Sequence, residues 1–413
     1  MSAPDRGEPS VKAASTRRQF LLGGAAAGVG AAATLGIGYA LTPHGEATPA
    51  SVPLNGDETV PFYGTHQAGV DTDAQAHAMF IGLYLHPETD RDGLRRMMGI
   101  LTDDAARLAQ GVPPLADSEP ELAVAPARLT VTFGFGPGFV TRASGTGPQW
   151  LQPLPAFGID QLQPEYGDGD LLIQVASDDP VTVAHATRML LKDTRSFASL
   201  RWVQPGFRRA HGSVKPGTTM RNLFGQVDGT TNPTPGTTDF DKVVWATGGW
   251  LTGGTGAVIR RIRMDLDKWD RLDRSGRDQA VGRFQSNGAP LTSSPHEQAA
   301  EFDEPDFEAK TSTGFTVIPE FSHMARARPV EAGERIFRRA YNYQGPPVGD
   351  ELSESGLIFV SYQADVERQF VPIQRRLDEL DLLNEWTTPI GSAVFALPPG
   401  CAEGGFIGDT LLT

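Results

Sequence analysis

The strongest constraint on the fold is a pattern of strands and helices that occurs twice along the chain. In the first half, the amphipathic segment 91–110 places its Leu and Met residues on one face, which predicts a helix. The other elements expected there are strands at 78–85, 129–135, 171–176 and 200–203 and a second helix at 181–193. The resulting β-α-β-β-α-β order is typical of a ferredoxin-like arrangement.

The second half repeats this order more loosely. Its expected elements are strands at 257–264, 357–362 and 393–397, part of a helix at 277–284 and a helix at 366–383. The stretch 286–315 has few periodic signals and is expected to leave the domain core. We therefore predict an α+β protein with an N-terminal domain at 62–215 and a C-terminal domain at 216–413.

The N-terminus is typical of a targeting signal. Arg17 and Arg18 precede Gln19-Phe-Leu-Leu and a weakly apolar stretch rich in Ala and Gly, which is a twin-arginine pattern. A membrane anchor is the alternative, because about 20 apolar residues can cross a bilayer. Six glycines between Gly23 and Gly38 make this stretch a poor membrane helix. We predict a signal peptide at 1–42, a flexible spacer at 43–61, and export by the twin-arginine machinery to the cell envelope or outside.

The composition is that of a globular protein with an acidic surface. The chain has 413 residues, 39% of them hydrophobic and 21% charged, and a net charge of −14. This charge argues against a nucleic-acid partner. Cys401 is the only cysteine, so no intrachain disulfide can form. His-Glu-x-x-His and paired-cysteine zinc patterns are absent from the sequence. The oligomeric state stays open, and an oligomer is possible.

One carboxylate stands in a distinctive glycine setting. In Asn222-Leu-Phe-Gly-Gln-Val-Asp-Gly, Asp228 lies between Gly225 and Gly229. Glycine adopts backbone conformations closed to other residues and lets a bulky ligand come close. Asp-Gly is also a common turn dipeptide, so this segment alone leaves a simple turn open.

A histidine and an arginine cluster follow about ninety residues later. His323 lies in Pro-Glu-Phe-Ser-His-Met-Ala-Arg-Ala-Arg-Pro, and the run Arg-Arg-Ala-Tyr-Asn-Tyr begins at Arg338. Arg339 is sixteen residues after His323. Imidazole is a frequent haem ligand in peroxidases, although an isolated histidine is more often a surface or core residue.

Taken together, these motifs resemble those of the dye-decolourising (DyP-type) haem peroxidases. The resemblance implies two ferredoxin-like domains with facing antiparallel sheets, related to the dimeric α+β barrel fold. It implies that His323 binds the iron, that Asp228 and Arg339 form the distal catalytic pair, and that Asp365 is the carboxylate partner of His323. The implied contacts to haem are Gly229, Thr230, Thr231, Arg328, Pro329 and Arg339. Arg328 departs from the family, which usually has Asn there.

The resemblance also implies an activity. We expect an exported peroxidase with one haem b per chain, using hydrogen peroxide to oxidise small aromatic donors such as phenols or dyes. No Cys-x-x-Cys-His is present, so the haem would be held non-covalently. The alternatives are a deferrochelatase-type release of iron from haem and a haem carrier without turnover.

Overall fold

The computed structural model describes residues 54–413. The predicted signal peptide at 1–42, with Arg17 and Arg18, and the first part of the predicted spacer lie outside the described residues. The rest of that spacer belongs to the folded body. Residues Asn55–Asp57 form a 3₁₀ turn, and Gly56 and Glu58 accept backbone hydrogen bonds from Ala127 and Arg128 at 3.0 and 2.7 Å. The prediction of a flexible spacer therefore does not hold for residues 55–58.

The N-terminal half has the predicted order of elements, with one short helix, α2, that was not predicted. They are β1 (His77–Leu85), α1 (Arg91–Ala109), β2 (Thr130–Phe135), α2 (Pro137–Arg142), β3 (Leu171–Ser177), α3 (Pro180–Thr194) and β4 (Ala198–Phe207). Both long helices begin at an aspartate whose carboxylate accepts a backbone N–H, Asp90 for α1 and Asp179 for α3. The strands pair antiparallel in the order β2-β3-β1-β4. This is the ferredoxin-like order.

The C-terminal half has the same sheet order with different helices. Its elements are α4 (Thr238–Val244), β5 (Thr255–Met264), α5 (Leu266–Trp269), α6 (Arg274–Val281), α7 (His323–Ala327), β6 (Phe337–Arg338), β7 (Tyr341–Gln344), β8 (Ser355–Gln363), α8 (Val371–Leu380) and β9 (Thr387–Leu397). A long excursion between β5 and β6 takes the place of the first helix. The short strands β6 and β7 were not predicted.

The predicted helix at 366–383 is divided into three parts. Residues Val366–Phe370 form a π-helical turn, α8 follows, and Leu382–Glu385 form a 3₁₀ turn. Pro372 lies in the first turn of α8. Proline has no backbone N–H to donate, so a regular α-helix cannot run through this position without losing a hydrogen bond.

The two sheets face each other and join at both edges. Single pairs connect β2 to β9 (Phe135 with Ala396) and β4 to β7 (Phe207 with Asn342), and β5 pairs with both β9 and β8. Eight strands therefore close into a ring, and β6 adds to it by pairing with β8. Its interior is filled by buried side chains from both halves, among them Phe80, Trp202 and Phe395. The predicted fold class is confirmed.

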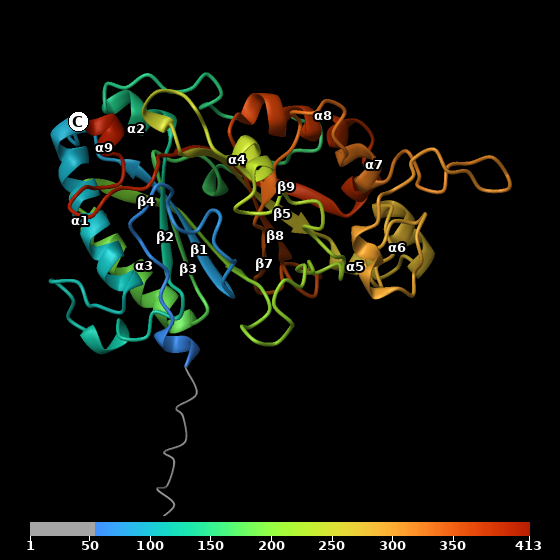
Figure 1. Cartoon of the computed structure of the whole chain (residues 1–413), viewed down its shortest axis with the longest axis horizontal. Helices are drawn as coiled ribbons and strands as arrows, with labels where there is room; N and C mark the ends of the chain where they lie inside the picture. The colour runs from blue at the N-terminus through green and yellow to red at the C-terminus, as the bar shows by residue number, and fades with distance from the viewer. Residues whose placement is uncertain (1–53) are drawn as a thin grey trace, which may run out of the picture. The chain divides into compact units, whose positions relative to one another are not determined.

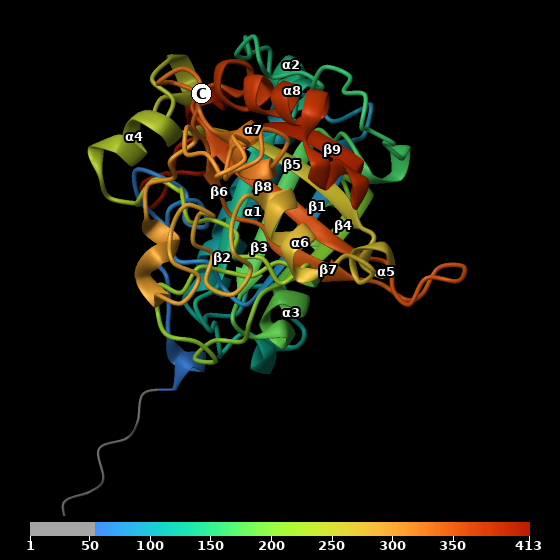
Figure 2. The ribbon, with the colours of Figure 1, turned by 90° about the vertical axis from the view of Figure 1, so that its right-hand side faces the viewer.

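Helices cover the outer faces of the strands. Helices α1 and α3 lie against the strands of the N-terminal half, while α7 and α8 lie beside those of the C-terminal half (Figure 1). In the turned view, α6, α7 and α8 stand in front of β5, β8 and β9 (Figure 2). Within residues 54–413, no helix combines the length and hydropathy that a membrane crossing needs.

Candidate active site

A cavity of about 390 Å³ lies between the outer face of the C-terminal strands and the layer formed by α7 and α8. Ile262, Leu357 and Phe359 line it from the strands, and Ile373 and Leu377 line it from α8. Side chains alternate along a strand, so Leu357 and Phe359 face the cavity while their neighbours face the closed interior of the ring. The volume lies in the range of small-molecule sites.

Asp228 is presented to this cavity by a tight turn. Gly225 and Gly229 have φ angles of 80° and 125°, a backbone region that favours glycine. A bridge between Arg221 and Val227 closes the turn, and the Asp228 N–H donates to Met220 O at 2.9 Å. The two glycines are therefore required by the backbone, and the segment is a turn that carries Asp228 into the cavity lining.

Arg338 is the arginine that meets Asp228. Its Nη1 donates to Asp228 Oδ1 at 2.8 Å, and both side chains line the cavity. The exposed fractions are 25% for Arg338 and 12% for Asp228, so the ion pair stays partly exposed to solvent. Asn232 fixes the backbone of Arg338 from both sides, because its amide accepts from the Arg338 N–H at 3.0 Å and donates to the Arg338 carbonyl at 2.7 Å. Neither Arg338 nor Asn232 was predicted as part of the site.

Arg339, the predicted distal arginine, does not reach the cavity. Its guanidinium points into the ring interior, where it donates to the carbonyl oxygens of Thr72 and Asp73 and to Gln75 Oε1. Only 2% of Arg339 is exposed. Arg338 ends β6, and Arg339 directly follows it and donates its N–H to Val360 of β8. Successive side chains of an extended chain face opposite sides, so the two arginines lie in opposite environments. The prediction that Arg339 lies in the site is therefore wrong, and Arg338 lies there instead.

His323 enters the cavity from the helical wall. It is the first residue of α7, and Ser322 before it is the N-cap of this helix. His323 Nδ1 donates to Asp381 Oδ2 at 2.6 Å, and Asp381 is only 3% exposed. Burial acts to lower the pKa of His323, but the carboxylate of Asp381 outweighs it and the pKa is raised. Because Nδ1 is engaged, Nε2 is the ring nitrogen left for a metal.

Asp381, not Asp365, is therefore the partner of His323. Asp365 caps the π-helical turn, where its Oδ1 accepts from the Arg368 N–H at 2.9 Å. It does not line the cavity. Asp365 is therefore a helix cap, and its predicted role beside the histidine is wrong. Asp381 also caps a turn, because its Oδ1 accepts a hydrogen bond from the Leu383 N–H at 2.9 Å. Its local sequence therefore indicates only a cap and gives no sign of the contact with His323.

The other residues predicted to contact haem do line the cavity. They are Gly229, Thr230, Thr231, Arg328 and Pro329. The excursion adds Glu304, Pro305 and Phe307 at the same end, and the Arg328 guanidinium lies 4.4 Å from the centre of the Phe307 ring. Thr231, Glu304 and Arg328 are exposed, so this end forms the mouth of the cavity.

Two family models match most of the chain. That of the Dyp-type peroxidase N-terminal domain matches residues 67–208, and that of the C-terminal domain matches residues 219–402. The chain belongs to the Dyp-type peroxidase family. It is therefore a peroxidase, and the predicted haem cofactor is confirmed with the family.

Several relatives of this DyP-type peroxidase match it over nearly their full length. It is 34% identical to the dye-decolorizing peroxidase of Thermobifida fusca, with 100% of both chains covered. It is 32% identical to the deferrochelatase of Escherichia coli K12, covering 86% of this chain and 88% of that one. The crystal structure of a DyP-type peroxidase from Cellulomonas bogoriensis is 50% identical and superposes with a TM-score of 0.83, covering 87% of this chain and 99% of that chain.

Proposed function

We propose that this DyP-type peroxidase reduces hydrogen peroxide in the cavity beneath α7 and α8 and oxidises phenolic or dye-like donors. His323 is the iron ligand, and Asp228 and Arg338 act on the peroxide. One observation carries the proposal: a carboxylate–arginine pair and a carboxylate–histidine pair line the same mostly apolar cavity. A haem carrier without turnover would need only the second of these pairs.

The cavity suits a haem group. Its apolar walls come from the strands on one side and α8 on the other, and a planar apolar ring would contact both. Arg328, Thr230 and Thr231 at the mouth can take the carboxylates of haem. When bound, haem supplies the iron redox chemistry that couples peroxide reduction to one-electron oxidation of each donor. The sequence offers no Cys-x-x-Cys-His for covalent attachment.

Asp381 prepares His323 for this role. Its hydrogen bond fixes the imidazole tautomer and ring orientation, and it increases the basicity of the ligand nitrogen. The bond is short, and Asp381 is held in turn by the Leu383 N–H. The imidazole is therefore a strong donor in a fixed orientation.

Asp228 and Arg338 divide the work on the peroxide. Asp228 takes the proton from one oxygen of hydrogen peroxide and returns it to the other as the O–O bond breaks, a role typically worth about 10²–10⁴-fold. Arg338 stabilises the negative charge that develops on the leaving oxygen. One peroxide and two phenols then give two waters and two phenoxyl radicals, because each phenol supplies one electron and one proton.

Steady-state oxidation of a phenol by the haem-loaded protein tests the proposal. Wild-type protein should turn over only with hydrogen peroxide present, and Asp228→Asn should reduce kcat by about 10²-fold while haem content is unchanged. Equal turnover by wild type and Asp228→Asn would remove the carboxylate from the reaction.

A second candidate function is release of iron from haem. The similarity to proteins named deferrochelatase, at 32% identity over most of the chain, favours testing it. Incubation of the haem-loaded protein with a reductant should then produce fluorescent metal-free protoporphyrin. Fluorescence at the level of free haem in the same buffer would reject this activity.

We also propose that the protein is exported by the twin-arginine route, as the pattern around Arg17 and Arg18 indicates. This route carries folded proteins, so haem can be inserted before export. The cell-envelope or extracellular location follows from the same signal.

A further inference from the structure

One segment of the N-terminal half forms part of the cavity wall. Residues 150–163, here called the strap, connect α2 to β3 and lie across the C-terminal half. Ile159 of the strap lines the cavity, and all other described lining residues come from position 222 onward. The cavity is therefore completed by a segment that is remote in sequence from the rest of its wall.

Polar contacts attach the strap to α8 and β9. The Asp378 carboxylate on α8 accepts hydrogen bonds from the N–H groups of Gly158 and Ile159 at 3.0 and 2.9 Å. Further along, Gln161 and Gln163 donate to the backbone carbonyls of Pro389 and Ile390 in β9. One carboxylate thus holds the two strap residues nearest to the cavity.

A buried ion pair lies where the strap meets the cavity. Asp160 of the strap pairs with Arg260 of β5, which lines the cavity and is 1% exposed. Burial raises the pKa of Asp160 and lowers that of Arg260. The attraction between the two charges therefore does not fully offset the cost of removing them from water. Among the described residues, Nε and Nη1 of Arg260 have no hydrogen-bond partner. The polar contact at this point is therefore made by Nη2 of Arg260 alone.

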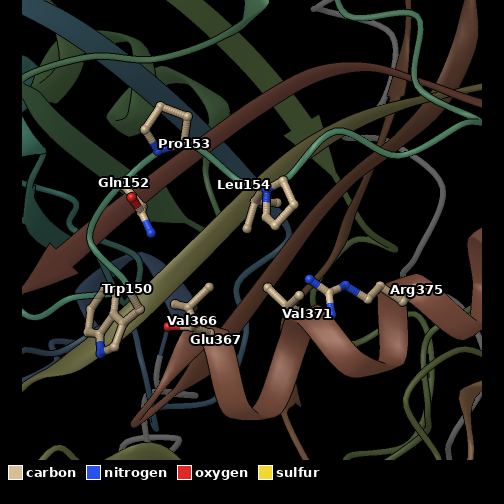
Figure 3. Close-up of a pocket in the computed structure, with 9 residues that line it drawn as sticks. Trp150, Gln152, Pro153, Leu154, Val366, Glu367, Val371 and Arg375 are labelled. Atoms are coloured by element: carbon tan, nitrogen blue, oxygen red, sulfur yellow. The ribbon is translucent and has the colours of Figure 1, made fainter.

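Apolar packing fixes only parts of the strap. Trp150 and Leu151 are buried at its first end, and Phe157 is buried below the Arg260 guanidinium. Between them, a space of about 50 Å³ separates the strap from the start of α8 (Figure 3). Residues 152, 153, 155 and 156 are exposed. Segments with few apolar contacts are the ones that open locally.

We propose that the strap is a releasable wall of the cavity and that its opening from α8 is the route by which haem enters and leaves. The inference rests on the proposed function, because it assumes that haem occupies this cavity. Hydrogen peroxide and donors would use the mouth at Thr231, Glu304 and Arg328, which lies outside the strap. Exchange of the cofactor and access of substrates are then controlled by different segments.

Haem transfer from the loaded full-length protein to excess apomyoglobin, followed by absorption, tests the proposal. Asp378→Ala removes the two hydrogen bonds from Gly158 and Ile159, at a residue that does not line the cavity, and should speed haem loss about tenfold or more. Glu379→Ala is the matched control, because Glu379 is the next residue of α8 and its ion pair with Arg326 is exposed. It should change the rate by less than about threefold.

A cross-link tests the same motion in the opposite direction. A Cβ atom at Gly158 would lie 3.9 Å from Asp378 Cγ, so Gly158→Cys with Asp378→Cys places two thiols within bonding reach. Oxidised, this variant should lose haem more slowly than wild type, and reduced, faster. Equal loss from wild type, Asp378→Ala and both redox forms would overturn the strap proposal alone. Failure of the wild type to bind haem would refute the proposed function, and the strap proposal with it.

Discussion

The two adjacent arginines should have separable roles, which a pair of leucine substitutions can show. Arg338 contacts Asp228 in the cavity, whereas Arg339 serves three acceptors in the ring interior. Arg338→Leu removes the charge that stabilises the leaving oxygen, and losing one such contact costs about 10²–10³ in rate. Its effect on stability should be small, since the ion pair is partly exposed and worth about 1 kcal/mol.

Arg339→Leu should show the reverse pattern. It leaves the carbonyls of Thr72 and Asp73 and the Gln75 amide oxygen without their donor in a buried setting. Each unsatisfied group costs about 1–3 kcal/mol, so we expect a loss of about 3–5 kcal/mol in the free energy of unfolding after relaxation. The melting temperature should fall by about 5 °C or more.

Two assays separate the outcomes. Thermal unfolding followed by circular dichroism gives stability, and rapid mixing of haem-loaded protein with hydrogen peroxide gives the rate of the Soret change. Arg338→Leu should react slowly and melt near wild type, while folded Arg339→Leu should react near the wild-type rate and melt early. A wild-type peroxide rate in Arg338→Leu, with slow reaction in a fully folded Arg339→Leu, would refute the assignment made from the structure.

Three further predictions concern other parts of the molecule. Asp381→Asn should weaken iron binding or activity by about 10–100-fold, whereas Asp365→Asn, which affects only a cap, should leave both unchanged; equal effects on haem titration would reject Asp381 as the partner. Burial and the neighbouring Asp104 raise the pKa of Asp193 to about 7. The free energy of unfolding is therefore highest below about pH 4 and falls as the pH rises through about 7. Asp193→Asn should recover about 1–2 kcal/mol of it at pH 8, after allowance for solvent screening. Urea unfolding at pH 5 and pH 8 checks this, and an unchanged pH dependence would contradict it. Replacing Arg17 and Arg18 by Lys should retain the protein in the cytoplasm, and cell fractionation that finds normal export would exclude the twin-arginine route.

The sequence predicted the long strands and the long helices because their periodicity reflects burial on one face. It did not predict the short helices α2, α4, α5 and α7. It failed for β6 and β7, which contain two and four residues and are held by pairing with β8. Such short strands leave too few alternations to detect. The divided helix near Pro372 could have been anticipated from the proline itself.

For the site, the sequence predicted Asp228 and His323, which both line the cavity, but it predicted as their partners residues that do not contact them. The Arg-Arg run fixed the position of the arginine only to within one residue, and along a strand one residue decides which face a side chain occupies. Asp365 and Asp381 both precede helical turns and both act as caps. Only the arrangement of α7 beside α8 shows which carboxylate reaches the histidine.

The absorption spectrum during haem titration of wild type and His323→Ala, recorded before and after one equivalent of hydrogen peroxide, tests the central claim most directly. Wild-type protein should give a Soret band that saturates at one haem per chain and changes on mixing with peroxide. His323→Ala removes the proposed protein bond to iron, so this band and its response should be lost or strongly altered. A His323→Ala variant with the wild-type spectrum and the wild-type response to peroxide would contradict the account, because the iron would then be bound elsewhere.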